Sequence, residues 1–197
     1  MPSSAVRTFS DPDEYATAIR ATNTEFTVTG HGPFAAKLIR IDLHRMWIQG
    51  ASDNLPRVAH STNIPGRAVV SFRTQPGPSL LTAGLEMQPT NIVRHSEGQS
   101  YHRRSSGPAS YGSMSLPVAV MASLGSAIAA FDLTPPKDPL IHTPPRSAMM
   151  KLRRLHAAAV CGGDPGNNRQ SGCCSRARAG AFRRHGRLPQ PPQRPRK

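Results

Sequence analysis

The chain has 197 residues, with 25 Lys or Arg against 11 Asp or Glu, for a net charge of +14. This length predicts one ordinary domain with an appendage, because two compact domains would only just fit. The chain has no apolar run of the roughly 18 residues needed to cross a membrane, and its polar beginning is not a secretory signal. We therefore expect a cytoplasmic protein without a membrane partner.

The positive charge is concentrated near the C-terminal end. Residues 161–197 contain nine Lys or Arg and one Asp, together with all three cysteines. The same segment has no Val, Ile, Met, Trp or Tyr, so it cannot bury enough apolar surface to offset the entropy lost on ordering. We predict a structured region up to about residue 160 and a disordered basic tail over 161–197.

The predicted elements begin with a short helix and continue with strands. Ser10 or Asp11 can cap the helix and Pro12 suits its first turn, and we expect the helix to end near residues 22–23. Eight short segments then alternate polar and apolar residues between Gly and Pro breaks: 25–29, 34–43, 46–48, 55–59, 68–72, 80–87, 91–93 and 110–114. This spacing, without βαβ alternation, predicts a mainly β fold, an antiparallel sandwich or barrel flanked by helices.

Two further helices are predicted after the strands. Ser115 can cap an apolar, Ala-rich helix over 118–131, with Pro117 in its first turn. The Pro-rich segment 132–145 is expected to be an extended link. Thr143 then caps a connector helix over 144–159. The apolar face predicted for this helix contains Ala148, Leu152, Leu155 and Ala159.

Three motifs resemble one family. The segments Phe-Ser-Asp-Pro-Asp-Glu-Tyr at 9–15, Met-Gln-Pro-Thr-Asn at 87–91 and Leu-Thr-Pro-Pro at 133–136 occur in this order. In that order they resemble the N-terminal regulatory region of AraC-type bacterial transcription regulators, over about residues 7–159. The resemblance implies a cupin-like ligand-binding or dimerisation domain over 1–116 and a helical linker or dimerisation region over 117–160.

The same resemblance implies function and partners. In that family the intact protein binds promoter DNA through two helix-turn-helix units and often responds to a small molecule. A small-molecule effector and a second copy of the chain are therefore the expected partners, with Leu152 and Leu155 as contacts of the dimer or linker helix. Residues 161–197 lack the apolar periodicity of a helix-turn-helix core, so we expect no specific DNA binding by this chain.

The basic tail has two interpretations. A permitted choice of codons for residues 163–192, read one nucleotide later, encodes an amphipathic helical string. We therefore expect 161–197 to be a frameshift product that truncates the regulator, and the nucleotide sequence read in all frames tests this. In the alternative, the tail is a genuine arm of a small nucleic-acid-binding protein. The arm would contact phosphates through Arg176, Arg178, Arg183 and Arg184.

Candidate ligand-binding residues come from the predicted sheet. Met46, Trp47 and Phe72 are candidates for lining an effector pocket, because aromatic and apolar side chains often line such pockets. Plain core packing is the alternative, and it is favoured for Met46 and Trp47. The basic run over 101–104, Tyr-His-Arg-Arg, is interpreted as a solvated loop between strands.

Metal and catalytic signals are weak. The nearest metal-ligand cluster is His95, Glu97 and His102, but no His-x-His pair occurs before the tail, and a solvated loop is favoured. The tail cysteines have no second paired motif, and no nucleophile elbow, Walker loop or dinucleotide fingerprint occurs. We expect no enzyme activity, no metal and no cofactor. A cupin-type metalloenzyme remains an alternative that would require a bound metal.

Overall fold

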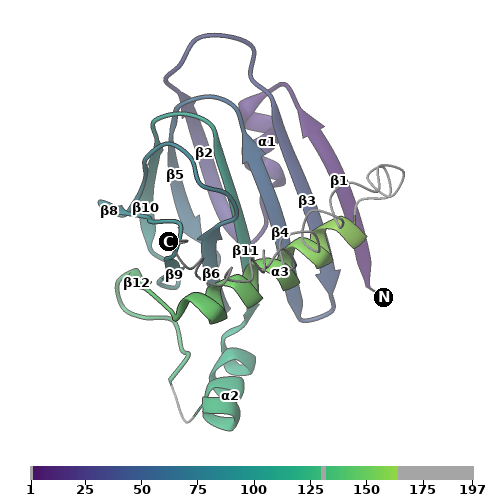
Figure 1. The fold of residues 1–197 in the computed structure, drawn as a ribbon, viewed down its shortest axis with the longest axis vertical. Helices are drawn as coiled ribbons and strands as arrows, with labels where there is room; N and C mark the ends of the chain where they lie inside the picture. Colours follow the sequence, from purple (N-terminus) through teal and green to yellow (C-terminus); the bar gives the residue numbers. More distant parts are fainter. Residues whose placement is uncertain (1, 130–131, 164–197) are drawn as a thin grey trace, which may run out of the picture.

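The computed structural model describes residues 2–129 and 132–163, which form two antiparallel sheets facing each other (Figure 1). The seven-stranded sheet has the order β1 (Ser3–Phe9), β3 (Ala36–Leu43), β4 (Met46–Asp53), β11 (Ala109–Pro117), β6 (Arg67–Arg73), β9 (Ile92–Arg94), β12 (Leu140–His142). The five-stranded sheet has the order β2 (Thr22–Val28), β5 (Arg57–Asn63), β10 (Ser100–Ser105), β7 (Leu80–Thr82), β8 (Leu85–Glu86). The predicted class, a mainly β antiparallel sandwich with flanking helices, is confirmed. The predicted tail lies outside the described residues.

Strand alternation divides the interior of the sandwich into an apolar and a polar part. Near the N-terminal helix α1 (Pro12–Ala18), Tyr15 is fully buried and stacks on Phe26 with ring centroids 5.3 Å apart. Phe9, Leu38 and other apolar residues complete this cluster. Farther along the same inner faces, Ser, Thr, Arg and His side chains replace the apolar ones. The polar part of the interior is therefore the unusual feature of this fold.

The predicted N-terminal helix is confirmed, but it is shorter than expected. The Asp11 carboxylate accepts hydrogen bonds from the backbone N–H groups of Asp13 and Glu14, at 2.7 and 3.1 Å, and so caps α1. The helix ends at Ala18 rather than near residues 22–23, because Ile19 adopts an extended backbone and β2 begins at Thr22.

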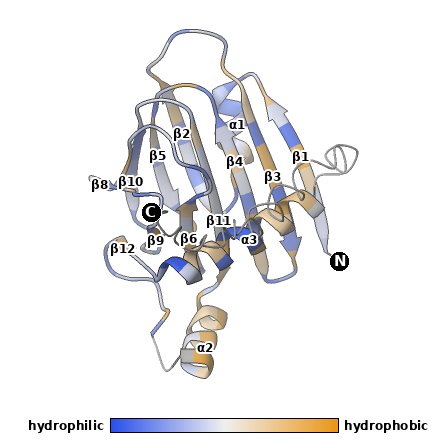
Figure 2. Ribbon diagram, in the orientation of Figure 1, coloured by the Kyte–Doolittle hydropathy of each residue, from blue (hydrophilic) through white to orange (hydrophobic). Residues whose placement is uncertain are grey.

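The second helix, α2 (Val118–Ala129), follows β11 without a loop and contacts β11 and β6. In Figure 1 it projects from one end of the sandwich, and Figure 2 shows that it is largely hydrophobic. Ile128 is 79% exposed on it. Within the described residues, no helix has the length and apolar character to cross a membrane.

The third helix, α3 (Arg146–Gly162), lies across the outer face of the seven-stranded sheet (Figure 1). It begins after Pro145 with no side-chain cap, so the predicted cap at Thr143 is wrong. Its buried residues are Met149 and His156. The predicted apolar face is therefore displaced, since Ala148 and Leu155 are exposed to solvent.

A pair of glycines gives α3 its close approach to the sheet. Gly50 on β4 and Gly112 on β11 lie opposite each other in the strand register. A Cβ on Gly112 would lie 2.7 Å from Nε2 of His156 and 2.8 Å from Cζ of Phe72. His156 Nε2 also lies 2.9 Å from the Gln49 carbonyl oxygen. The His156 side chain on α3 therefore occupies a space on the outer face of the sheet that the Cβ of any other residue at position 112 would block.

Candidate functional site

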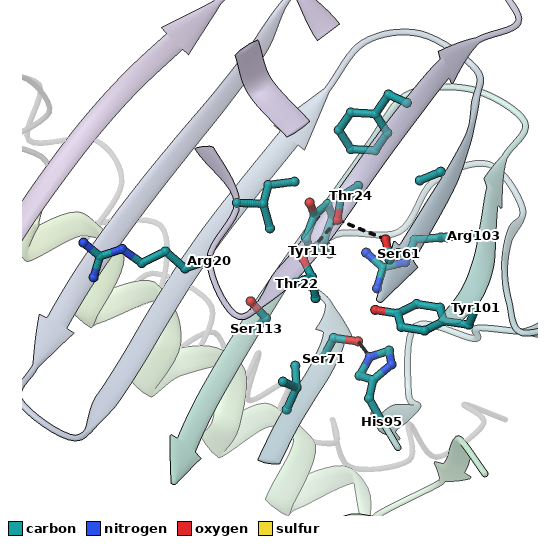
Figure 3. A pocket seen from close by; sticks show the side chains of 14 residues that line it. Arg20, Thr22, Thr24, Ser61, Ser71, His95, Tyr101, Arg103, Tyr111 and Ser113 are labelled. Atoms are coloured by element: carbon teal, nitrogen blue, oxygen red, sulfur yellow. Dashed lines mark hydrogen bonds between the residues drawn. The ribbon is translucent and has the colours of Figure 1, made fainter. Parts of the chain in front are cut away.

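A small cavity lies between the two sheets in the polar part of the interior (Figure 3). Its free volume is about 20 Å³, which is room for about one water molecule. β2, β5 and β10 of one sheet and β6 and β11 of the other contribute inward-facing side chains to it. The polar side chains around it are Arg20, Thr22, Thr24, Ser61, Ser71, His95, Tyr101, Arg103, Tyr111 and Ser113.

Arg103 is the charged residue of β10 whose side chain points inward. The strand alternates buried and exposed residues, so Tyr101 and Arg103 point inward while His102 and Arg104 point outward. The Arg103 guanidinium carbon lies 5.0 Å from the centre of the Tyr111 ring, and Arg103 is only 9% exposed. Among the described residues, its Nε has no hydrogen-bond partner and no carboxylate forms an ion pair with it.

His95 also lines the cavity, where its ring packs against that of Tyr101 with centroids 4.8 Å apart. Its Nε2 lies 2.7 Å from the Ser71 hydroxyl, and its Nδ1 has no partner among the described residues. Burial, assisted by the charge of Arg103, lowers the pKa of His95 from 6.5 to about 3. The imidazole is therefore neutral at neutral pH and can offer one donor and one acceptor nitrogen.

A buried ion pair lies next to this cavity. Arg57 donates to Asp53 at 2.7 Å, and both side chains are almost fully buried. Burial alone would lower the pKa of Arg57, but the charge and hydrogen bond of Asp53 raise it overall. Arg57 Nε and Nη1 and Asp53 Oδ1 have no partner within the described chain. Buried polar groups are usually satisfied, so this concentration of unsatisfied atoms marks the interior as a candidate binding site.

The sequence-predicted pocket residues do not come together. Trp47 is on the inner face of β4, where Arg67 stacks on it at 3.5 Å, and it lines a solvent-open hollow of about 530 Å³ beside β2. Phe72 is fully buried on the opposite face of the sheet, with its ring 5.1 Å from that of His156. Met46 alternates with Trp47 along β4. Their grouping into one pocket is therefore wrong, while an effector contact by Trp47 stays a prediction.

The three residues of the candidate metal cluster also lie apart in the structure. His95 points into the interior, while His102 points outward and packs against His60 with ring centroids 5.0 Å apart. Glu97 accepts a hydrogen bond from the backbone N–H of Gly66. Within residues 2–129 and 132–163, no three His, Cys, Asp or Glu side chains converge on a point that could hold a metal ion.

The remaining predicted residues are on α3 and in the tail. Leu152 is half-buried and Leu155 is 62% exposed, and their role in a dimer stays a prediction. The arginines proposed for nucleic-acid contact, Arg176, Arg178, Arg183 and Arg184, lie outside the described residues.

A second hollow lies between α2 and the outer face of the seven-stranded sheet. It has a volume of about 280 Å³ and is lined mainly by apolar side chains, among them Val70, Ile92, Met121 and Leu133. It separates the outer face of β6 and β9 from α2 and the link that follows it. Its lining also includes His95 and His142, each with one buried nitrogen that has no hydrogen-bond partner in the described chain. Arg103, whose buried guanidinium nitrogen is unsatisfied, lines the inter-sheet cavity and not this hollow.

Comparisons with known proteins find only distant similarity. No protein family and no curated protein matches the sequence. Among solved structures, the chain is similar to the AraC-like transcriptional activator CuxR, with 14% identity and a TM-score of 0.44 over 65% of this chain and 53% of that chain. It is also similar to vicilin from Corylus avellana (hazelnut), with 9% identity and a TM-score of 0.29 over 75% of this chain and 52% of that one. The aligned region spans about half of each of those proteins.

Proposed function

We propose that this chain is the regulatory region of an AraC-type transcription regulator and that a small-molecule effector binds between its two sheets. The order of the three sequence motifs supports the family. One observation carries the binding site: Arg103 and His95, which line the inter-sheet cavity, each have a buried nitrogen without a hydrogen-bond partner in the described chain. A homodimer, a cytoplasmic location and the absence of catalysis are parts of the same proposal.

The polar interior lowers the stability of the folded chain. A buried donor or acceptor without a partner costs about 1–3 kcal/mol, and a buried unpaired charge costs more. A protein selected only for stability would fill this space with apolar side chains. An effector that supplies the missing hydrogen bonds recovers the cost, and it therefore binds the folded protein and stabilises it.

β11 connects the interior with α3. Tyr111 and Ser113 point into the cavity, whereas Gly112 between them contacts His156 on the opposite face. A shift of β11 on effector binding would therefore change the space available to His156. In this proposal α3 carries the signal from the effector toward whatever follows the regulatory region.

Thermal unfolding with a panel of small polar metabolites tests the proposal. We expect at least one compound to raise the melting temperature of the wild-type chain, and we expect Ser113→Met, which fills the cavity, to remove that increase. Met114→Leu is the matched control, because Met114 is the next residue on β11 and faces outward. An increase that persists in Ser113→Met, or no binding compound at all, would contradict the proposed site.

A further inference from the structure

The charges in the polar interior do not balance. Arg57 and Arg103 are two buried guanidinium groups, and the charges of both favour the ionised form of the Asp53 carboxyl, whose pKa burial raises. Asp53 is already paired with Arg57, at 2.7 Å. His95 adds no charge at neutral pH, since its pKa is about 3. This part of the interior therefore carries one positive charge in excess, located at Arg103.

Hydroxyl groups surround Arg103, and the Tyr101 hydroxyl already forms side-chain hydrogen bonds with Arg103 and Ser61. Tyr101 and Tyr111 place their rings beside its guanidinium, with ring centres 5.8 and 5.0 Å from its central carbon. Figure 3 shows Arg103 and Tyr101 pointing toward the same space, with Ser61 beside them. Hydroxyl groups and a guanidinium can all donate hydrogen bonds to an oxygen anion.

We propose that the effector is a small carboxylic acid whose carboxylate binds Arg103 inside the sandwich, an inference that rests on the proposed function. Two parallel N–H groups of a guanidinium match the two oxygens of a carboxylate, which makes this pair strong and directional. Taking Arg103 out of water is costly unless an opposite charge accompanies it. The free volume of about 20 Å³ admits only a small group before the sheets must move apart.

Matched acids and amides provide the test. The melting temperature of the chain is compared in formate and acetate with that in formamide and acetamide, at constant ionic strength and neutral pH. Each acid has nearly the shape of its amide but carries a charge. We expect a saturable increase with an acid and no increase with its amide. Equal effects of acid and amide would overturn the inference.

Variants on one strand locate the anion. Arg103→Met keeps an unbranched apolar side chain and removes the guanidinium with its charge, while Arg104→Met makes the same change on the outward face of β10. We expect Arg103→Met to abolish the response to acetate and to raise the melting temperature without acetate, because an unpaired buried charge is removed. Arg104→Met should respond as the wild type does. A response retained in Arg103→Met would overturn the inference.

Further variants and outcomes distinguish failure of the carboxylate inference from failure of the proposed binding site. If Arg103→Met does not fold, Arg103→Lys retains the charge without the planar fork, and we expect a weaker but measurable response to acetate. If neutral compounds bind in a manner that Ser113→Met removes while the acids do not bind, the carboxylate inference fails and the proposed function stands. If neither acids nor neutral compounds bind at the interior, the proposed site itself fails.

Discussion

His95 is neutral because it is completely buried next to Arg103, and this ties the stability of the fold to pH. Its pKa is about 3 in the folded chain against 6.5 for an ordinary histidine. Between these values the unfolded chain binds a proton that the folded chain does not, so the folded state loses stability as the pH falls. The stability that His95 contributes is complete above about pH 6.5.

Urea unfolding at several pH values tests this prediction. We expect the free energy of unfolding to fall by about 1.4 kcal/mol for each pH unit between about 6 and 4 on account of His95. His95→Gln should reduce this slope, whereas His102→Gln, on the outward face of β10, should leave it unchanged. Identical slopes for wild type and His95→Gln would show that His95 is not the group responsible.

The residues of the candidate site are hard to predict because their pattern is polar. In β10 the inward residues are Tyr101, Arg103 and Ser105, and the outward ones are also polar. Alternation between polar and apolar residues, the usual strand signal, is therefore missing. The interpretation of residues 101–104 as a solvated loop is wrong for this reason. One local sign of the inward face is the aromatic Tyr101, because residues two apart lie on the same side of a strand and Tyr101 therefore shares a side with Arg103.

At the scale of elements, the sequence predicts the strands in which apolar residues recur at alternate positions on one face or the other. The segments 25–29, 34–43, 68–72 and 91–93 overlap β2, β3, β6 and β9. The sequence does not predict β1 and β12, because β1 is an edge strand with mostly exposed residues and β12 has only three residues. Both depend on pairing with β3 and β9, which are distant in sequence. Local patterns do not contain this information.

One side of α3 is buried against the sheet and the other faces solvent, and substitutions on the two sides should differ in their effect on stability. Met149 is 3% exposed beneath the helix, whereas Leu155 is 62% exposed. We expect Met149→Ala to destabilise the chain by about 2–4 kcal/mol, because it removes buried contacts and leaves a cavity. Leu155→Ala should change stability by less than about 0.5 kcal/mol. Denaturation midpoints measure both effects.

Leu155→Ala also tests the predicted dimer. If Leu155 contributes to a contact between two copies, Leu155→Ala should lower the fraction of dimer in sedimentation experiments without changing the fold. A chain that sediments as a monomer at every concentration would contradict the homodimer.

At the scale of the whole molecule, the net charge of +14 favours contact with polyanions. We expect this chain to bind duplex DNA without sequence preference and with an affinity that falls steeply as salt rises. Replacing Arg176, Arg178, Arg183 and Arg184 by Gln should remove much of this binding. The slope of log affinity against log salt should become shallower by about 0.9 for each phosphate that is no longer neutralised. Fluorescence anisotropy with two unrelated duplexes measures it.

Sequence-specific DNA binding is the result that would contradict this prediction. Binding to one promoter sequence at physiological salt, with no binding to the unrelated duplex, would contradict the expected lack of specific recognition. It would also require a recognition element that the sequence of 161–197 does not predict.

The pairing of β12 with β9 has a consequence for the synthesis of the chain. β12 completes the edge of the seven-stranded sheet, yet it follows α2 and the Pro-rich link in sequence. A nascent chain that has reached only residue 117 therefore presents β9 as an open edge, where another strand can add. Only after residue 142 has emerged from the ribosome can that edge be covered by the chain itself. In the interval between these two points, the β9 edge is open to strands of neighbouring chains on a polysome.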